Sequence, residues 1–60
     1  MHYELVTKNT PEGVRYYGRL RDDDGEDLML TPARERKHEA EHAITVARTS
    51  THAAVYHISE

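Results

Sequence analysis

The 60-residue chain contains no cysteine, no phenylalanine and no tryptophan. Without cysteine the protein can form neither a disulfide nor a zinc site built from thiolates. No apolar run approaches the roughly 20 residues that a membrane-spanning helix needs. The opening MHYELVTK also lacks the apolar stretch of a signal peptide. We therefore expect a cytoplasmic protein that does not enter a membrane.

Large apolar residues are also scarce. A lone domain of this length buries only roughly 60% of the surface that its unfolded chain exposes, so its stability is marginal. Such domains usually gain stability from disulfides, a metal or a partner subunit. Because disulfides are excluded, a metal or self-association remains. Beside two methionines and four tyrosines, the large apolar residues are Leu5, Val6, Val14, Leu20, Leu28, Leu30, Ile44, Val46, Val55 and Ile58.

The charge pattern is mildly acidic. The formal net charge is −3 at pH 7, which argues against nonspecific binding to nucleic acid. Only Lys8 and Lys37 are lysines, and the run DDDGED spans residues 22–27. This run lacks the ligand spacing of a calcium-binding loop. The shortage of lysine and the acidic run together predict a salt-adapted, halophilic protein.

The first half of the chain alternates in polarity with period two, which is typical of strands. The expected strands are residues 2–7, 14–21 and 27–31, separated by the turn sequences KNTPEG and DDDGED. This order predicts a three-stranded antiparallel meander. The side chains expected on its inner face are Tyr3, Leu5, Thr7, Val14, Tyr16, Gly18, Leu20, Leu28 and Leu30.

The period changes after residue 31. A helix could start at Thr31-Pro32, since proline suits the first turn. The glutamate of a capping box is missing, so the start could also lie nearer Glu35. The spacing i, i+3, i+4, i+7 indicates a helix lying on a core, and its small residues imply a close approach to the sheet. The residues with this spacing are Ala40, Ala43, Ile44 and Ala47.

Residues 52–59, HAAVYHIS, predict a fourth strand. We favour Ala54, Tyr56 and Ile58 as its inner face over the alternative of Ala53, Val55 and His57. His52 and His57 are expected to be surface or interface residues.

These elements predict an α+β fold in one domain, residues 1–60. The chain order is strand-strand-strand-helix-strand, an antiparallel sheet with one helix packed on it. The other sheet face is left bare, which favours completion by homodimerisation. The predicted core is Tyr3, Leu5, Val14, Tyr16, Leu20, Leu28, Leu30, Ala40, Ala43, Ile44, Ala47, Tyr56 and Ile58.

The stretch HEAEH, residues 38–42, fits the H-E-x-x-H signature of zinc metallopeptidases. In those enzymes two histidines one helical turn apart bind zinc, and the glutamate activates a water molecule. Here Arg48 stands where one class places its third ligand, and the only later glutamate is the last residue. At about 100° per residue, His38 and His42 lie nearly opposite the alanine stripe and should face solvent.

Sixty residues also leave no room for a catalytic cleft. We therefore expect no enzyme activity and no cofactor. Adventitious zinc binding at His38 and His42 is a possible property of the exposed pair. A zinc-dependent hydrolase using His38, Glu39 and His42 is the least favoured function.

Arg15, Tyr17 and Arg19 alternate basic and aromatic side chains along one face of the second strand. Such a face can stack on and neutralise single-stranded nucleic acid. The other interpretation is an outer sheet face whose arginines pair across strands with Glu4 and neighbouring acids. Asp22 and the acids that follow it would repel phosphate. Pairing is favoured, and nucleic-acid binding is kept as the alternative function.

The segments YYGRLRDDDGEDLMLT and RKHEAEHAITVAR resemble the YegP-like family of small uncharacterised proteins. The opening YELVTKN resembles the first strand of that family. Two departures stand out: Ala33-Arg34 where the family often has Gly-Tyr, and Gly18 near a position usually filled by a bulky residue. The matching residues are Arg19, Leu20, Arg21, Gly25, Glu26, Lys37, Ala40, Ala43 and Ile44, with Ala43 where the family has glycine.

The resemblance implies a ββ(β)αβ unit. Many members of the family carry two such units in tandem, whereas this chain has one. Two chains should therefore pair as a two-fold homodimer. The family has no established activity, so the resemblance implies no catalytic residue. The expected function is that of a non-enzymatic, homodimeric binding or interaction module.

Overall fold

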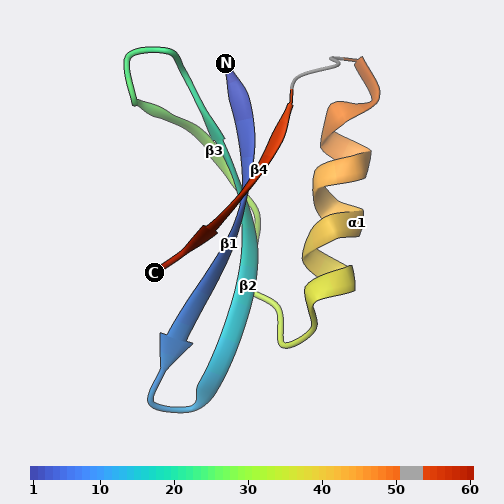
Figure 1. The fold of residues 1–60 in the computed structure, drawn as a ribbon. Helices are drawn as coiled ribbons and strands as arrows, with labels where there is room; N and C mark the ends of the chain where they lie inside the picture. Colours follow the sequence, from blue (N-terminus) through green and yellow to red (C-terminus); the bar gives the residue numbers. More distant parts are fainter. Residues whose placement is uncertain (51–53) are drawn as a thin grey trace.

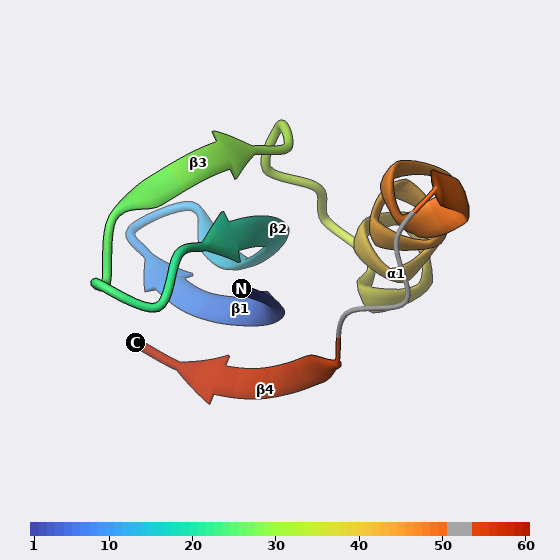
Figure 2. The same cartoon turned by 90° about the horizontal axis from the view of Figure 1, so that it is seen from above.

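Over the residues that it describes, 1–50 and 54–60, the computed structural model consists of four strands and one α-helix (Figure 1). The strands form one sheet of order β3-β2-β1-β4, and α1 lies on one side of it (Figure 2). The expected α+β fold with one helix on a sheet is confirmed. In chain order the elements are β1 (His2–Thr10), β2 (Gly13–Arg21), β3 (Asp27–Leu30), α1 (Lys37–Ala47), the 3-10 turn η1 (Arg48–Ser50) and β4 (Val55–Ser59).

The last strand makes the sheet mixed rather than entirely antiparallel. The pairs β1–β2 and β2–β3 are antiparallel, whereas β4 runs parallel to β1. A parallel pair needs a crossover connection, and α1 provides it. The N–H of Tyr3 donates to the carbonyl of Ala54 (2.8 Å), which fixes the start of β4 beside the start of β1. The predicted positions of His52 and Ala53 lie outside the described residues.

The first two strands form a longer hairpin than the sequence predicts, because the ladder continues to the pair Thr10–Gly13. Glycine permits the tight turn there, since the φ of Gly13 is +124°. The second turn contains Gly25 at φ +84°, and the N–H of Gly25 donates to the carbonyl of Asp22 (3.0 Å). The turn predicted at DDDGED is therefore confirmed, whereas the turn predicted at KNTPEG is shorter than expected, because Lys8 to Thr10 belong to β1 and Gly13 to β2.

The core lies between α1 and the two central strands. Four of the predicted core residues are fully buried there: Tyr3, Leu5, Ala40 and Ile44. The Tyr3 hydroxyl donates to the carbonyl of Ala47 (3.1 Å), which ties the last turn of α1 to β1. The half-buried residues that pack against this cluster are Tyr16, Leu20, Met29, Ala47 and Val55.

Gly18 sets the distance between α1 and the sheet. A Cβ atom at this position would lie 2.6 Å from Cγ1 of Ile44, closer than real Cβ contacts. Only a glycine therefore allows Ile44 to rest on β2 here. The close approach predicted from the alanines of α1 is confirmed, and the departure from the resembled family at residue 18 has a structural reason.

Strands β3 and β4 are oriented opposite to the prediction: the side chains that face the core are those predicted to face away from it. In β3, Leu20 pairs with Met29, so Met29 lies on the helix side and Leu28 and Leu30 are exposed on the other. A register shift at Leu20/Arg21, a β-bulge, changes the alternation. In β4, Tyr3 pairs with Val55 and Leu5 with His57, so over the described residues the disfavoured alternative, with Val55 and His57 on the helix side, is the correct one.

The predictions that Leu28, Leu30 and Tyr56 are core residues are therefore wrong. Val14 is also exposed, because it lies near the hairpin end where α1 does not cover β2. Ile58 is half-buried on the side away from α1, paired with Val6.

The helix starts at Lys37, so the predicted start at Thr31-Pro32 is wrong and the alternative start near Glu35 is closer to the observed one. Residues 31–34 remain extended because they still bond to β2. The N–H of Thr31 donates to the Gly18 carbonyl (2.9 Å), and Tyr16 forms an antiparallel bridge with Arg34. Proline disfavours a helical backbone in the residue that precedes it, which agrees with the extended conformation at Thr31 before Pro32. In the described part of the chain, no helix has the length and apolar character to cross a membrane.

Candidate functional site

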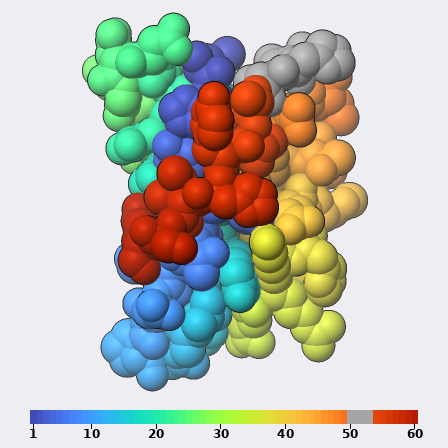
Figure 3. Space-filling model, in the orientation of Figure 1, coloured from blue at the N-terminus to red at the C-terminus, as the bar shows by residue number. Residues whose placement is uncertain are grey.

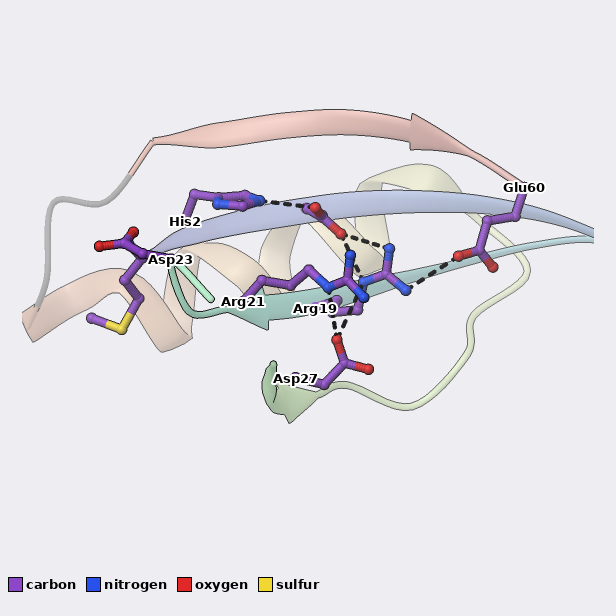
Figure 4. A network of polar contacts seen from close by, with 8 residues as sticks. His2, Arg19, Arg21, Asp23, Asp27 and Glu60 are labelled. Atoms are coloured by element: carbon purple, nitrogen blue, oxygen red, sulfur yellow. Dashed lines mark hydrogen bonds and ion pairs between the residues drawn. The ribbon is translucent and has the colours of Figure 1, made fainter. Parts of the chain in front are cut away.

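The sheet face turned away from α1 carries a network of paired charges (Figure 4). At its centre is Glu4 on β1, of which only 6% is exposed. Its Oε1 accepts from Arg19 Nε (2.7 Å) and lies 2.6 Å from Arg19 Nη2. Its Oε2 lies 2.8 Å from Nε2 of His2. Both carboxylate oxygens are thus bonded, which is the condition for burying a charge on a sheet.

Arg19 connects three strands through its guanidinium group. Nη1 donates to Glu60 (3.2 Å), beyond the end of β4, and Nε lies 3.9 Å from Asp27 on β3. Figure 4 shows Arg19 between these two acids. Arg21 adds a bond from Nε to the same Asp27 oxygen (2.9 Å). The network therefore links β1, β2 and β3 with the residue that follows β4.

The pKa values follow from these contacts. Burial alone would raise the pKa of the Glu4 carboxyl, but the hydrogen bonds from His2 and Arg19 and the positive charges of Arg19 and Arg21 lower it below its ordinary value. For Arg19, burial opposes the charge, yet the bonds to Glu4 and Glu60 raise the pKa. Burial and the Glu60 charge raise the pKa of the Tyr17 hydroxyl. Glu4 and Arg19 thus form an ion pair near neutral pH, in which each charge neutralises the other.

Of the predicted nucleic-acid residues, Tyr17 and Arg19 belong to this network and Arg15 does not. Arg19 is held by Glu4, as the pairing interpretation requires, and the Tyr17 hydroxyl donates to Glu60 (3.3 Å). Arg15 lies at a distance from the network, with Nη1 donating to the carbonyl of Val14 (3.1 Å) and Nη2 3.9 Å from Glu35. The structure therefore does not bring Arg15, Tyr17 and Arg19 together as free groups.

Exposed apolar side chains flank the network. Leu28 and Leu30 lie on β3 at one edge, and Tyr56 lies on β4 at the other. The Tyr56 ring contacts the ring of His2 edge-on, with centroids 5.0 Å apart. Val6, also on this face, is fully buried between its strand partners Tyr17 and Ile58. The face therefore has an ordered polar centre and apolar edges.

His38 and His42 project from α1 and are exposed, as predicted. Together with Arg34, Glu39 and Ala43 they line an open surface hollow of about 330 Å³. Over residues 1–50 and 54–60, no group of three or more His, Asp or Glu side chains is arranged to hold a metal ion. The pair offers two ligands, fewer than the three protein ligands of a catalytic zinc site.

Sequence reasoning named Glu4 as a partner of the arginines but missed His2, Asp27 and Glu60. The signal that could find them is strand register: the pairs Glu4–Arg19 and Arg21–Asp27 are direct cross-strand neighbours. Glu60 enters because β4 runs parallel to β1, which the sequence pattern does not reveal.

No family model, no curated protein and no solved structure matches this chain. The resemblance to the YegP-like family therefore stays a prediction.

Proposed function

We propose that this chain is a non-enzymatic interaction protein that acts as a homodimer, with the sheet face opposite α1 as the surface shared by two copies. The observation that carries the proposal is this face itself. It is covered by no described element, it bears exposed Leu28, Leu30 and Tyr56, and its charged centre is already paired.

The pairing of the charges favours burial of the face. An unpaired charge placed in an interface is strongly destabilising, whereas Glu4 and Arg19 neutralise each other before any partner arrives. Asp27 and Glu60 are also bonded to arginines. A second copy can therefore cover the centre and gain its stabilisation from the apolar edges.

The size of the molecule also favours a broad face. A stable interface buries about 800 Å² on each partner. The Cα atoms span 32 × 23 × 15 Å, so a contact of that area must use one of the broad faces. An isologous two-fold pairing with its axis along the strands would place β3 of one copy near β4 of the other, apolar edge against apolar edge.

The test is the mass of the assembly in native mass spectrometry and sedimentation, using protein purified without a chelator. We expect a metal-free dimer for the wild type. Leu30→Asp should give a monomer, because it places a charge on the shared face. Val46→Asp is the matched control, since Val46 on α1 is exposed to the same degree, 56% against 58% for Leu30. A monomeric wild type, or a dimer that survives Leu30→Asp, contradicts the proposal.

The other functions receive less support. Nucleic-acid binding would need Arg19 to leave a buried carboxylate, and a zinc-dependent hydrolase would need a ligand beyond His38 and His42. The cytoplasmic location and the salt adaptation belong to the proposal as predictions from composition.

A further inference from the structure

A second surface lies between α1 and β4. Within the described ranges, α1 packs against β1 and β2 and not against β4. A hollow of about 210 Å³ remains between side chains of the helix and the strand, whose atoms border each other in the view of Figure 3. Its lining is mixed: Leu5, Ile44 and Val55 contribute apolar atoms, and the other lining residues are the polar Glu41, Thr45, Arg48 and His57. It is smaller than the roughly 300–1,000 Å³ of typical small-molecule pockets, so it fits about one side chain better than a whole cofactor.

One end of this hollow carries an arginine with a buried donor, Nε, that has no acceptor in the described part of the chain. This arginine is Arg48, which caps the C-terminus of α1 and lines the hollow. A buried donor left unsatisfied costs about 1–3 kcal/mol. The acid on the rim, Glu41, lies two helical turns away, about 10 Å along the axis at 1.5 Å per residue. The Arg48 end is therefore suited to a carboxylate.

The strand beside the hollow is a sheet edge. β4 ends the strand order. The carbonyl of Ala54 and the N–H of Glu60 bond to β1, and successive residues of a strand direct their peptide groups to opposite sides. Val55, His57 and Ser59 therefore present their N–H and C=O groups to the open edge. The side chains of Val55 and His57 line the hollow, so an added strand would place the residues opposite them on the same side of the sheet.

We propose that the edge of β4 and this hollow bind an extended peptide segment that adds to the sheet as a fifth strand. Its signature is an apolar residue and an acidic residue two positions apart. The acidic residue bonds to Arg48, and the apolar residue enters the hollow beside Leu5 and Ile44. Main-chain hydrogen bonds supply affinity in such complexes, and the side-chain pocket supplies specificity.

This inference names the partner class of the proposed interaction function and rests on it, but it uses a different surface. The dimer face carries Leu30 and Glu4, whereas the peptide would lie beside Val55 and Arg48. A free small carboxylate would satisfy Arg48 and leave the edge of β4 unpaired. A second copy paired edge to edge would satisfy the edge and bring His57 rather than an acid to the hollow. The peptide alone meets both requirements.

The test is fluorescence anisotropy with an eight-residue, fluorescein-labelled peptide of threonine and valine that has Leu-Thr-Asp at its centre. We expect saturable binding by the wild type, weakened about tenfold or more by Arg48→Met. The exposed Arg36→Met is the matched control and should bind as the wild type does. Because Arg48→Met removes a buried unsatisfied donor, thermal unfolding should show that it is at least as stable as the wild type.

Two altered peptides separate the contributions. Replacing the peptide aspartate by asparagine should weaken binding to the wild type and have little effect on Arg48→Met. Methylating alternate peptide nitrogens should abolish binding if the segment pairs with β4.

Several results would overturn the inference: no saturable binding, an affinity unchanged in Arg48→Met, or binding that survives N-methylation and is displaced by octanoate. The dimer proposal is judged separately, because monomeric Leu30→Asp should still bind the peptide. Binding seen only in that variant would mean that a second copy covers β4, and would also overturn the inference.

Discussion

Replacing Gly18 by alanine tests how closely α1 lies on the sheet. The added Cβ would lie 2.6 Å from Cγ1 of Ile44, 3.2 Å from its Cδ1 and 3.3 Å from Cγ2 of Thr31. The first distance is shorter than real contacts, so Ile44 or the helix must shift. Ile44 is buried, and a rotation of its side chain would displace its neighbours in a close-packed core.

Two opposing effects decide the magnitude. Overpacking of this kind costs about 1–3 kcal/mol. Alanine suits the middle of a strand better than glycine by roughly 0.5–1 kcal/mol, because glycine loses more freedom on folding. The clash is the larger effect, so we expect Gly18→Ala to lower the free energy of unfolding by about 1–2 kcal/mol. For a domain of this size, that is a fall of roughly 5–15 °C in Tm.

The assay is thermal unfolding followed by circular dichroism at one fixed protein concentration, because dimerisation makes Tm depend on concentration. The control is the same substitution in an Ile44→Ala background. That background itself costs about 2–5 kcal/mol but removes both Ile44 atoms nearest to the new Cβ. In that background Gly18→Ala should be neutral or slightly stabilising, whereas in the wild type it is destabilising. The difference measures the interaction between residues 18 and 44. A rise in Tm for the single variant would show that α1 does not approach Gly18 as described.

Periodicity predicted the elements because it reports burial along one strand or helix. Tyr3 and Leu5 on β1, and Ala40 and Ile44 on α1, face each other as their spacing predicts, since both elements have one apolar side. In β3 the run Leu28-Met29-Leu30 is apolar at every position, so polarity does not alternate and does not predict which side chains face the core. There the bulge beside Arg21 decided the register, and a one-residue slip moves every side chain to the other side.

The candidate surfaces were harder to predict because they depend on which strands are neighbours. Glu60 reaches Arg19 only because β4 runs parallel to β1. In the sequence, Arg48 is only the residue that departs from a metallopeptidase signature, because the burial of its Nε depends on how the chain packs. Spacing alone does reveal the histidine pair of HEAEH, and both histidines are exposed, whereas Ala40 between them is buried.

Two further predictions concern the titratable groups. Zinc should bind weakly to the wild type in calorimetric titration. His42→Ala should lose that binding, and the control His57→Ala should keep it. Tight, stoichiometric zinc binding together with peptide hydrolysis would instead support the metallopeptidase alternative. Glu4→Gln should lower the free energy of urea unfolding at pH 7 by about 1.5–3 kcal/mol, because Arg19 loses a charged acceptor, while the exposed Glu41→Gln should not. The folded pKa of Glu4 lies below its ordinary value of 4.5, so this stabilisation is fully present above that pH and is lost as the pH falls through the folded pKa. Wild type and Glu4→Gln should therefore converge in acid, and a difference that stays constant down to pH 2 would mean that the ionised carboxylate does not stabilise the face.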